Sequence, residues 1–343
     1  TTTDAPRPGL GAPLSPVAGS GGREVPVQRR TTEGPQPSSA AVPDAQIPPP
    51  GPREQGSAPS KVAARPLIER GRLDAAHARV LPPLDAGVSP LLPAAGLRVL
   101  DLTRVLAGPV ATRTLGQLGA DVLRLDAPWL PELPDQHADT GFGKRSATLD
   151  LTTDRAAFEE LLAAADVVVT GYRPGALDRF GLSPEALAER RPGLVVAQVS
   201  AWGAYGPWGG RRGFDSLVQV ATGIAEIEGS AERPGTLPAQ ALDHGTGYLL
   251  AAGVLRALTE QSYDGGSRFV RLALARTARW LTEEVEPGSG TGEPYRGPDA
   301  WLAETDSSLG RLRYARPPVS FAGGPADWAR PPVPWGSSPA RWA

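Results

Sequence analysis

Apolar and polar positions follow two alternating patterns between residues 97 and 280. Short runs rich in Val and Leu are typical of strands that are buried on both faces of a parallel sheet. Between these runs, apolar residues recur at the spacing of amphipathic helices. The patterns predict strands at 97–102, 121–125, 147–151, 166–169, 194–199 and 269–274, and helices at 105–118, 155–165, 184–190, 215–229 and 243–261. This alternation indicates an α/β fold with a Rossmann-like, mostly parallel sheet flanked by helices.

The segments on either side of this region lack a sustained period. Residues 1–94 are rich in Pro and Gly and hold only short apolar stretches such as Leu67–Ile68. Because few large apolar side chains offset the entropy of ordering, a largely disordered arm and linker is expected there. Residues 286–343 are also irregular, but their tryptophans predict a tail that packs on a neighbouring surface. The predicted core is therefore residues 95–285.

Composition excludes several functions. With 35 Lys and Arg against 37 Asp and Glu, the net charge is −2, and no nucleic acid or membrane partner is expected. The chain has no cysteine, which excludes thiolate nucleophiles, and its three histidines lack metal-binding spacing, so no metal site is expected. The longest apolar run, Tyr248–Leu255, is far shorter than the roughly 20 residues of a membrane span. Since residues 1–22 contain no apolar leader, the expected location is the cytoplasm.

The turn after the first predicted strand reads Thr-Arg-Val-Leu-Ala-Gly-Pro at residues 103–109. Dinucleotide-binding proteins carry a Gly-x-Gly-x-x-Gly motif at this place, and its glycines let the backbone approach a pyrophosphate. Pro109 removes the flexibility that such a turn needs. No nicotinamide or flavin is therefore expected at this turn.

Seven blocks of sequence between residues 96 and 280 occur in the order typical of one enzyme family. The blocks lie at 99–109, 118–126, 143–151, 165–169, 172–181, 206–215 and 241–247. In this order they resemble the family III CoA-transferases. The resemblance implies the α/β fold of that family and the transfer of CoA between an acyl-CoA thioester and a carboxylic acid. It also implies a homodimer of interlocked chains, with coenzyme A as a substrate and not as a resident cofactor.

Asp243 matches the segment that holds the catalytic aspartate of that family. There the carboxylate attacks an acyl-CoA thioester, giving free CoA and a mixed anhydride, which conserves the free energy of the thioester. An acceptor acid then displaces the acyl group, and CoA attacks the new anhydride. On this resemblance Gly245 and Gly247 let substrate approach closely and leave backbone N–H groups free to stabilise an oxyanion. From the residue pattern alone, Asp243 can instead be the cap of the predicted helix 243–261.

The resemblance also assigns residues to a CoA site. Arg104 and Val105 follow the first predicted strand, where the family contacts CoA, and Arg104 could pair with a phosphate group. Lys144 and Arg145 are candidates for binding the nucleotide phosphates. For each of these cations, the alternative is a solvated charge on the surface.

Two further candidates follow the predicted strand 166–169. Tyr172 matches an aromatic residue that lines the CoA site and could stack on adenine, although a tyrosine at a strand end is often part of the core. Arg179 matches an arginine of the same region, with a solvated loop charge as the alternative. Gly171 stands where the family usually has Asn, which removes a side-chain amide from this site.

Two alternatives to a transferase stay open. The α-methylacyl-CoA racemases share the fold, but they pair their aspartate with a histidine at the position where this chain has Phe214. The other alternative is a catalytically inactive protein that binds CoA esters. The chain ends at residue 343, too soon after Asp243 for the glycine-rich loop that closes over the intermediate in the family. The sequence therefore indicates a shortened or divergent member.

Overall fold

The structure is a computed structural model, and it describes residues 62, 64–81, 87, 89–286, 288 and 295–343. Most of the predicted disordered arm lies outside the described residues. Part of that arm nevertheless belongs to the fold, because β1 (Glu69–Arg72) pairs antiparallel with β7 (Arg268–Ala273) and Ala94 is fully buried. The folded core thus begins before the boundary at residue 95 that the sequence predicted.

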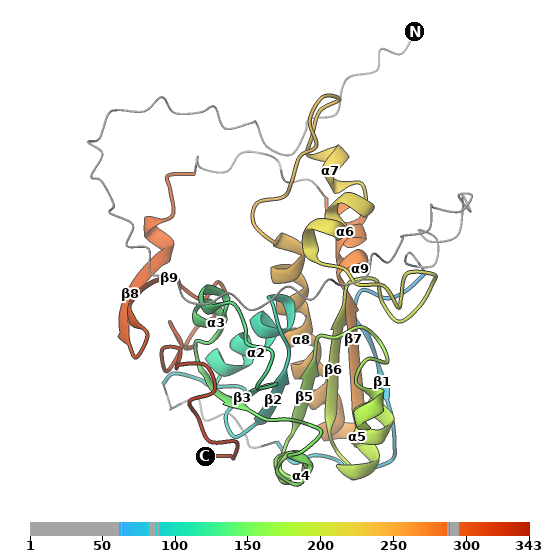
Figure 1. Ribbon diagram of the computed structural model, residues 1–343, viewed down its shortest axis with the longest axis vertical. Coiled ribbons are helices and arrows are strands. Elements are labelled where there is room, and N and C mark those ends of the chain that lie inside the picture. Colours follow the sequence, from blue (N-terminus) through green and yellow to red (C-terminus); the bar gives the residue numbers. More distant parts are fainter. Residues whose placement is uncertain (1–61, 63, 82–86, 88, 287, 289–294) are drawn as a thin grey trace, which may run out of the picture. The chain divides into compact units, whose positions relative to one another are not determined.

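The strands of the main sheet lie side by side in Figure 1. Among the described residues their order is β1, β7, β6 (Val195–Ser200), β5 (Val167–Thr170), β2 (Arg98–Leu102), β3 (Asp121–Asp126) and β4 (Lys144–Thr148). All neighbouring strands except β1 and β7 are parallel. The parallel strands follow the order of a doubly wound sheet, in which the direction of winding reverses between β2 and β5. The predicted mostly parallel α/β sheet is confirmed.

Helices cover both faces of this sheet (Figure 1). One face carries α2 (Ala107–Gln117), α8 (Ala241–Asp264) and α9 (Leu274–Arg279), and the other carries α4 (Arg155–Ala163) and α5 (Pro184–Arg190). Successive residues of a strand face opposite sides, so Val99 packs on the side of α2 and α8, and Leu100 packs on the side of α4 and α5. Both side chains are fully buried, which explains why the strand is apolar on both faces.

Most predicted elements differ from the structure by one to three residues at an end, and two of them differ in a way that has a clear physical reason. The strand expected at 147–151 begins earlier, because Lys144 pairs with Asp101 of β2 and Arg145 with Asp121 of β3, so both cations enter the sheet in spite of their charge. The helix expected at 215–229 is interrupted at Gly223, whose φ of 86° a helix does not allow. The remaining helical segments are α3 (Pro134–Thr140), α6 (Asp215–Ala221), α7 (Ile224–Ile227), η1 (Asp178–Phe180), η2 (Trp280–Glu284) and η3 (Asp299–Trp301).

The C-terminal segment packs on the domain, as its tryptophans predicted. Three indole N–H groups donate hydrogen bonds to it: Trp328 to Arg113 O (3.2 Å), Trp335 to Asp126 Oδ2 (3.1 Å) and Trp342 to Leu161 O (2.9 Å). The segment is not wholly irregular, since β8 (Leu302–Ser307) and β9 (Gly310–Ala315) form an antiparallel hairpin. Many residues of this hairpin are exposed, and its sequence is correspondingly polar. It therefore lacks the continuous apolar run from which the other strands were predicted.

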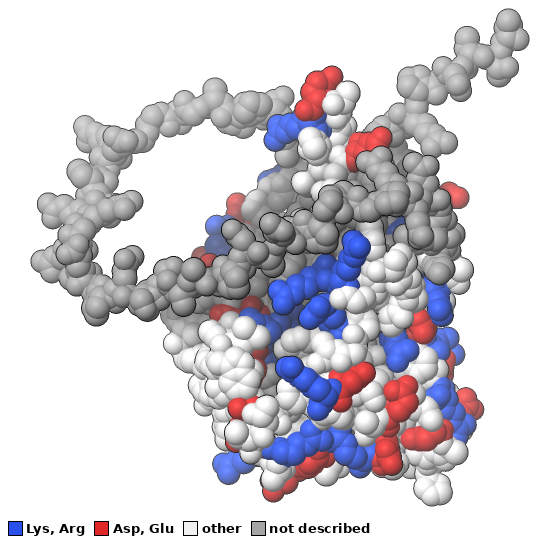
Figure 2. Space-filling view, turned by 45° about the vertical axis from the view of Figure 1, so that its right-hand side comes forward, with Lys and Arg blue, Asp and Glu red and all other residues white. Residues whose placement is uncertain are grey.

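Charges of both signs are interspersed on the face that Figure 2 shows, in keeping with the net charge of −2. None of the helices in the described ranges combines the length and the apolar character that crossing a membrane requires. In the same part of the chain, no group of three or more His, Cys, Asp or Glu side chains could hold a metal ion.

Candidate active site

A pocket lies at the carboxyl ends of β2, β5 and β6, where the winding of the sheet reverses. Open α/β sheets bind their ligands at this position, in the crevice between the loops that leave the strands. Segments that are far apart in the sequence line the pocket: 104–108, 171, 199–201, 213–214, Asp243 and Leu274. The fold therefore brings together three residues predicted from the sequence, namely Arg104, Val105 and Asp243.

Asp243 is the third residue of α8, which follows the N-cap residue Gln240. The carboxylate that satisfies this helix end belongs to Asp215, whose Oδ2 accepts a hydrogen bond from the Asp243 N–H (2.9 Å). Asp215 is fully buried, and Gln219 Nε2 donates to its other oxygen, Oδ1 (2.5 Å). The capping role that the residue pattern allowed for Asp243 is thus filled by Asp215. The Asp243 side chain itself faces the pocket.

The surroundings of the Asp243 carboxyl group favour its neutral form. The residue is 7 % exposed, and the described residues donate no hydrogen bond to its carboxylate. Burial, and after it repulsion from Asp215, raises the pKa of Asp243 to about 7. At neutral pH a substantial fraction is therefore ionised, and this fraction is not weakened as a nucleophile by hydrogen-bond donors. Such an environment suits a reactive carboxylate.

Gly245 and Gly247 are the fifth and seventh residues of α8, so they lie beyond its first turn. A helix leaves only about its first four N–H groups without an internal acceptor, so the N–H groups of these two glycines point at preceding carbonyl groups. The oxyanion role predicted for them has no support from this geometry. Gly247 instead allows close packing, because a Cβ atom there would lie 2.6 Å from Ala107 O on α2.

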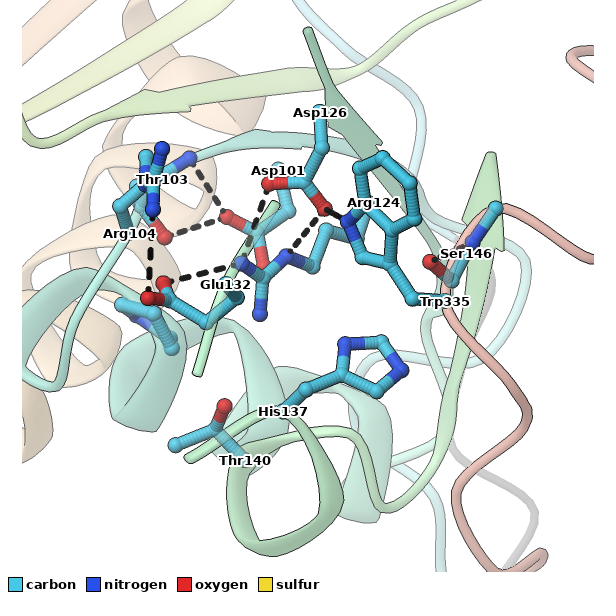
Figure 3. A network of polar contacts seen from close by, with 12 residues as sticks. Asp101, Thr103, Arg104, Arg124, Asp126, Glu132, His137, Thr140, Ser146 and Trp335 are labelled. Carbon is cyan, nitrogen blue, oxygen red and sulfur yellow. Dashed lines mark hydrogen bonds and ion pairs between the residues drawn. The ribbon is translucent and has the colours of Figure 1, made fainter. Parts of the chain in front are cut away.

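The loop after β2 is held by a network of buried charges (Figure 3). Arg104 donates to Leu130 O and Pro131 O (both 2.9 Å) and to Glu132 Oε1 (3.3 Å). The other oxygen of Glu132, Oε2, accepts from the Val105 N–H (2.9 Å). Arg104 thus lines the pocket, but its guanidinium is engaged by the neighbouring loop rather than being open to the phosphate group predicted for it.

Lys144 and Arg145 do not line this pocket. Lys144 is 1 % exposed, and its Nζ donates to Asp101 Oδ2 and Pro109 O (both 2.8 Å). Burial lowers the pKa of Lys144 to about 8, against the attraction of the Asp101 carboxylate. Arg145 pairs with Asp121 through Nε and Nη2. Asp121 begins β3, so this pair lies at the amino ends of the strands, whereas the pocket lies at their carboxyl ends. The phosphate-binding role predicted for both residues is not supported, because each cation is already neutralised by an aspartate.

A second groove begins at Tyr172, which directly follows the pocket residue Gly171. Tyr172 and Arg179, both predicted from the sequence, line this groove together. Burial raises the pKa of Tyr172, so its phenol is neutral at physiological pH. The Arg179 guanidinium lies 4.7 Å from the ring centre of Phe180. The fold therefore gathers aromatic and cationic groups beside the pocket.

Two residues of this groove were missed by the sequence analysis. Trp129 lines it and is 62 % exposed, and Arg173 lies next to Tyr172. A signal for Trp129 was present, because a tryptophan in a loop after a strand end needs a partner to cover its ring. Nothing in the local pattern distinguishes Arg173 from an ordinary surface charge.

Among the described residues that line the pocket, there is no histidine that could serve as the second base of a racemase. Phe214 lines it at the position where those enzymes carry histidine. His244 is next to Asp243 in the sequence but does not line the pocket, and burial together with Arg113 lowers its pKa. Within the described ranges, no histidine lines the pocket with Asp243, so a two-base proton transfer has no machinery here.

The sequence matches the family described as CoA-transferase family III over residues 94–296. It is 36% identical over 205 residues to a probable fatty acyl-CoA transferase, Rv3272, of Mycobacterium tuberculosis, covering 54% of this chain and 51% of the relative. It is 32% identical to the beta subunit of a succinyl-CoA–L-malate CoA-transferase of Chloroflexus aurantiacus, covering 60% and 54%. A crystal structure of Rv3272 has a TM-score of 0.53 at 35% identity, covering 57% of this chain and 58% of that one. The chain thus spans about half the length of the curated relatives it matches.

Proposed function

The chain belongs to CoA-transferase family III, and from this premise we propose that it moves CoA between an acyl-CoA thioester and a carboxylic acid. The observation that carries the proposal is the buried Asp243 carboxylate, which faces the pocket and receives no hydrogen bond from the described residues. Attack by this carboxylate forms a mixed anhydride, which keeps the acyl group in an energy-rich bond. A relative whose name joins succinyl-CoA with L-malate supports exchange between a thioester and an acid.

Three displacement steps complete the proposed reaction. First, an Asp243 oxygen attacks the thioester carbonyl carbon, the C–S bond breaks and CoA leaves as a thiolate. Next, the carboxylate of the acceptor acid attacks the Asp243 carbonyl carbon of the anhydride, and the first acid leaves as a carboxylate. Finally, the thiolate attacks the acyl carbon of the acceptor, which forms the new thioester and restores the Asp243 carboxylate. No net proton is taken up or released, so the reaction needs no acid–base histidine in the pocket.

The start of α2 supplies the groups that stabilise negative charge in these steps. Ala107 and Gly108 are the first two residues of α2, and both line the pocket. Their N–H groups have no acceptor inside the helix, and the partial positive charge of the helix end adds to their effect on an oxyanion. In this proposal they take the role that the sequence had suggested for Gly245 and Gly247.

The groove beside the pocket is suited to the nucleotide end of CoA. Tyr172 and Trp129 offer aromatic faces on which adenine can stack, and Arg173 and Arg179 offer guanidinium groups for phosphates. Gly171 lies between groove and pocket, and without a side chain it leaves room for the pantetheine arm to pass. Acyl-CoA and a carboxylic acid are thus the proposed substrates.

A second candidate function is binding of CoA esters without turnover. The chain spans about half the length of the curated relatives it matches, so turnover by this chain alone is itself part of the proposal. Both candidates use the same pocket and groove, and they differ in whether Asp243 becomes acylated. The interlocked homodimer and the cytoplasmic location stay predictions.

Mass spectrometry of the intact protein separates the two candidates. The protein is incubated with a panel of short acyl-CoA esters and hydroxylamine, which converts an aspartyl anhydride or thioester into a hydroxamate that peptide mapping can locate. A hydroxamate on Asp243 that is absent from Asp243→Ala supports the transferase. Binding of CoA without this label supports the inactive binder. A protein that neither binds CoA nor becomes labelled contradicts both.

A further inference from the structure

We propose that Glu132 is a positioning residue, which holds Arg104 and Val105 in the conformation that shapes the Asp243 pocket. Glu132 follows β3 and lies 27 residues from Val105 in the sequence, so no local pattern connects the two. The inference rests on the proposed function in one respect, because it takes the turn after β2 as a contact of CoA. The geometry that assigns the role to Glu132 does not depend on that function.

The turn that Glu132 holds is strained. Val105 has a φ of 69°, in the left-handed region, which a β-branched residue rarely adopts. Such a backbone persists only where its surroundings stabilise it, and it is found most often at ligand-binding sites. Glu132 is the neighbour that does so: Oε2 accepts from the Val105 N–H (2.9 Å), and Oε1 accepts from Arg104 Nη2 (3.3 Å). One carboxylate thereby fixes both residues of the turn.

Glu132 is itself held by a buried arginine (Figure 3). Arg124 is 1 % exposed, and its Nη2 donates to Glu132 Oε2 (3.1 Å). The same guanidinium donates to both oxygens of Asp126 (2.8 and 3.0 Å), and Asp126 Oδ2 accepts from Trp335 Nε1 (3.1 Å). Because a guanidinium is a planar and rigid donor, Asp126 and Trp335 set the direction in which Arg124 meets Glu132.

The charge of Glu132 is maintained inside the domain. Burial alone would raise its pKa, but the Val105 N–H and the charges of Arg124 and Arg104 lower the pKa below its ordinary value. Glu132 is therefore ionised at neutral pH and accepts its hydrogen bonds as a carboxylate. A charged acceptor that is buried with its donors gives a stronger and better directed contact than a neutral one.

Titration calorimetry with free CoA tests the role on four proteins: wild type, Glu132→Ala, Glu132→Gln and the double variant Glu132→Ala with Val105→Gly. Without the charged hydrogen bond to the Val105 N–H, the turn should adopt its CoA-binding conformation less often. We therefore expect a Kd about tenfold higher for Glu132→Ala. Glu132→Gln keeps an oxygen acceptor for the Val105 N–H and should retain more affinity than Glu132→Ala. Glycine adopts a positive φ without strain, so the double variant should recover part of the lost affinity.

This rescue is specific to the turn, because the glycine adds no contact elsewhere in the domain and only removes the strain at position 105. Glu159→Ala serves as the matched control, since Glu159 pairs with Arg155 and Arg190 on the face of α4 and α5 and should leave the Kd unchanged. Unchanged CoA affinity in Glu132→Ala, or no recovery in the double variant, would overturn the proposal.

Hydrogen exchange of residues 103–108 keeps the proposal testable if the proposed function fails. In Glu132→Ala the Val105 amide loses its acceptor, and its exchange should become at least about tenfold faster than in wild type. If wild type does not bind CoA, the proposed function fails and this exchange decides the role of Glu132 alone. Faster exchange then supports the role in shaping the turn, and unchanged exchange refutes it.

Discussion

Oδ2 of Asp215 accepts a hydrogen bond from the backbone N–H of Asp243 at 2.9 Å. One carboxylate thereby caps the helix that carries the other, and both are buried. The pairing has two consequences for Asp243. The hydrogen bond holds its backbone at the pocket, whereas the like charge of Asp215 adds to the burial that raises its pKa to about 7.

Asp215→Asn should separate these two consequences. Asparagine keeps an oxygen that can accept from the Asp243 N–H, but it removes the charge. The pKa of Asp243 should therefore fall, although not to its ordinary value, because burial is the larger cause of its shift. Since the ionised carboxylate is the proposed nucleophile, the pH midpoint of hydroxylamine labelling should move from about 7 to a lower pH. Glu159→Gln should not move it, and an equal midpoint in both variants would refute the coupling.

Asp243→Asn should stabilise the protein at alkaline pH. The folded-state pKa of Asp243 lies above the unfolded value of 3.8, so the folded state binds the proton more tightly. Ionisation of Asp243 therefore lowers stability as the pH rises from about 4 to about 7, and the full penalty is present at pH 8. At about 1.4 kcal/mol per unit, the variant should gain roughly 1–4 kcal/mol in the free energy of unfolding at pH 8. Urea denaturation at pH 8 and pH 4 checks this, with little difference expected at pH 4.

Lys144→Met should destabilise the fold much more than Arg145→Met does. Loss of Lys144 leaves the fully buried Asp101 without its direct cation, which typically costs about 3–5 kcal/mol. The pair of Arg145 with Asp121 is partly exposed, and its loss should cost about 1 kcal/mol or less. Urea denaturation measures both changes. A large loss of CoA affinity in Arg145→Met at nearly unchanged stability would instead favour the phosphate-binding role that the sequence suggested.

Arg179→Ala should weaken the binding of CoA about tenfold, because the substitution removes the charged hydrogen bond to phosphate that we propose for this residue. Pantetheine lacks the nucleotide, so its affinity should be unchanged by the same substitution. Titration calorimetry with both ligands makes the comparison, and Arg256→Ala on the exposed side of α8 is the matched control. Equal losses for CoA and pantetheine would show that the groove does not hold the nucleotide end.

Local patterns were sufficient for most of the sheet. Strands such as Val167–Thr170 are buried on both faces, and they can therefore be recognised from a continuous run of β-branched residues. Elements without such a run were misplaced or missed. The start of β4 was expected three residues too late, because it holds two cations that aspartates of β2 and β3 neutralise. The β8–β9 hairpin, which has many exposed residues, was not predicted.

The candidate nucleophile was also within reach of the sequence, because ordered blocks of residues carried the resemblance as far as Asp243. The sequence did not reveal which of the charged side chains remain free to bind a ligand. Lys144 is neutralised by Asp101, 43 residues away, and Val105 is held by Glu132, 27 residues away. Burial and pairing depend on such distant partners, and they shift pKa values and engage donors in ways that no neighbouring residue reveals. Secondary structure follows largely from the spacing of nearby side chains, whereas the chemistry of a site follows from which distant side chains the fold brings into contact.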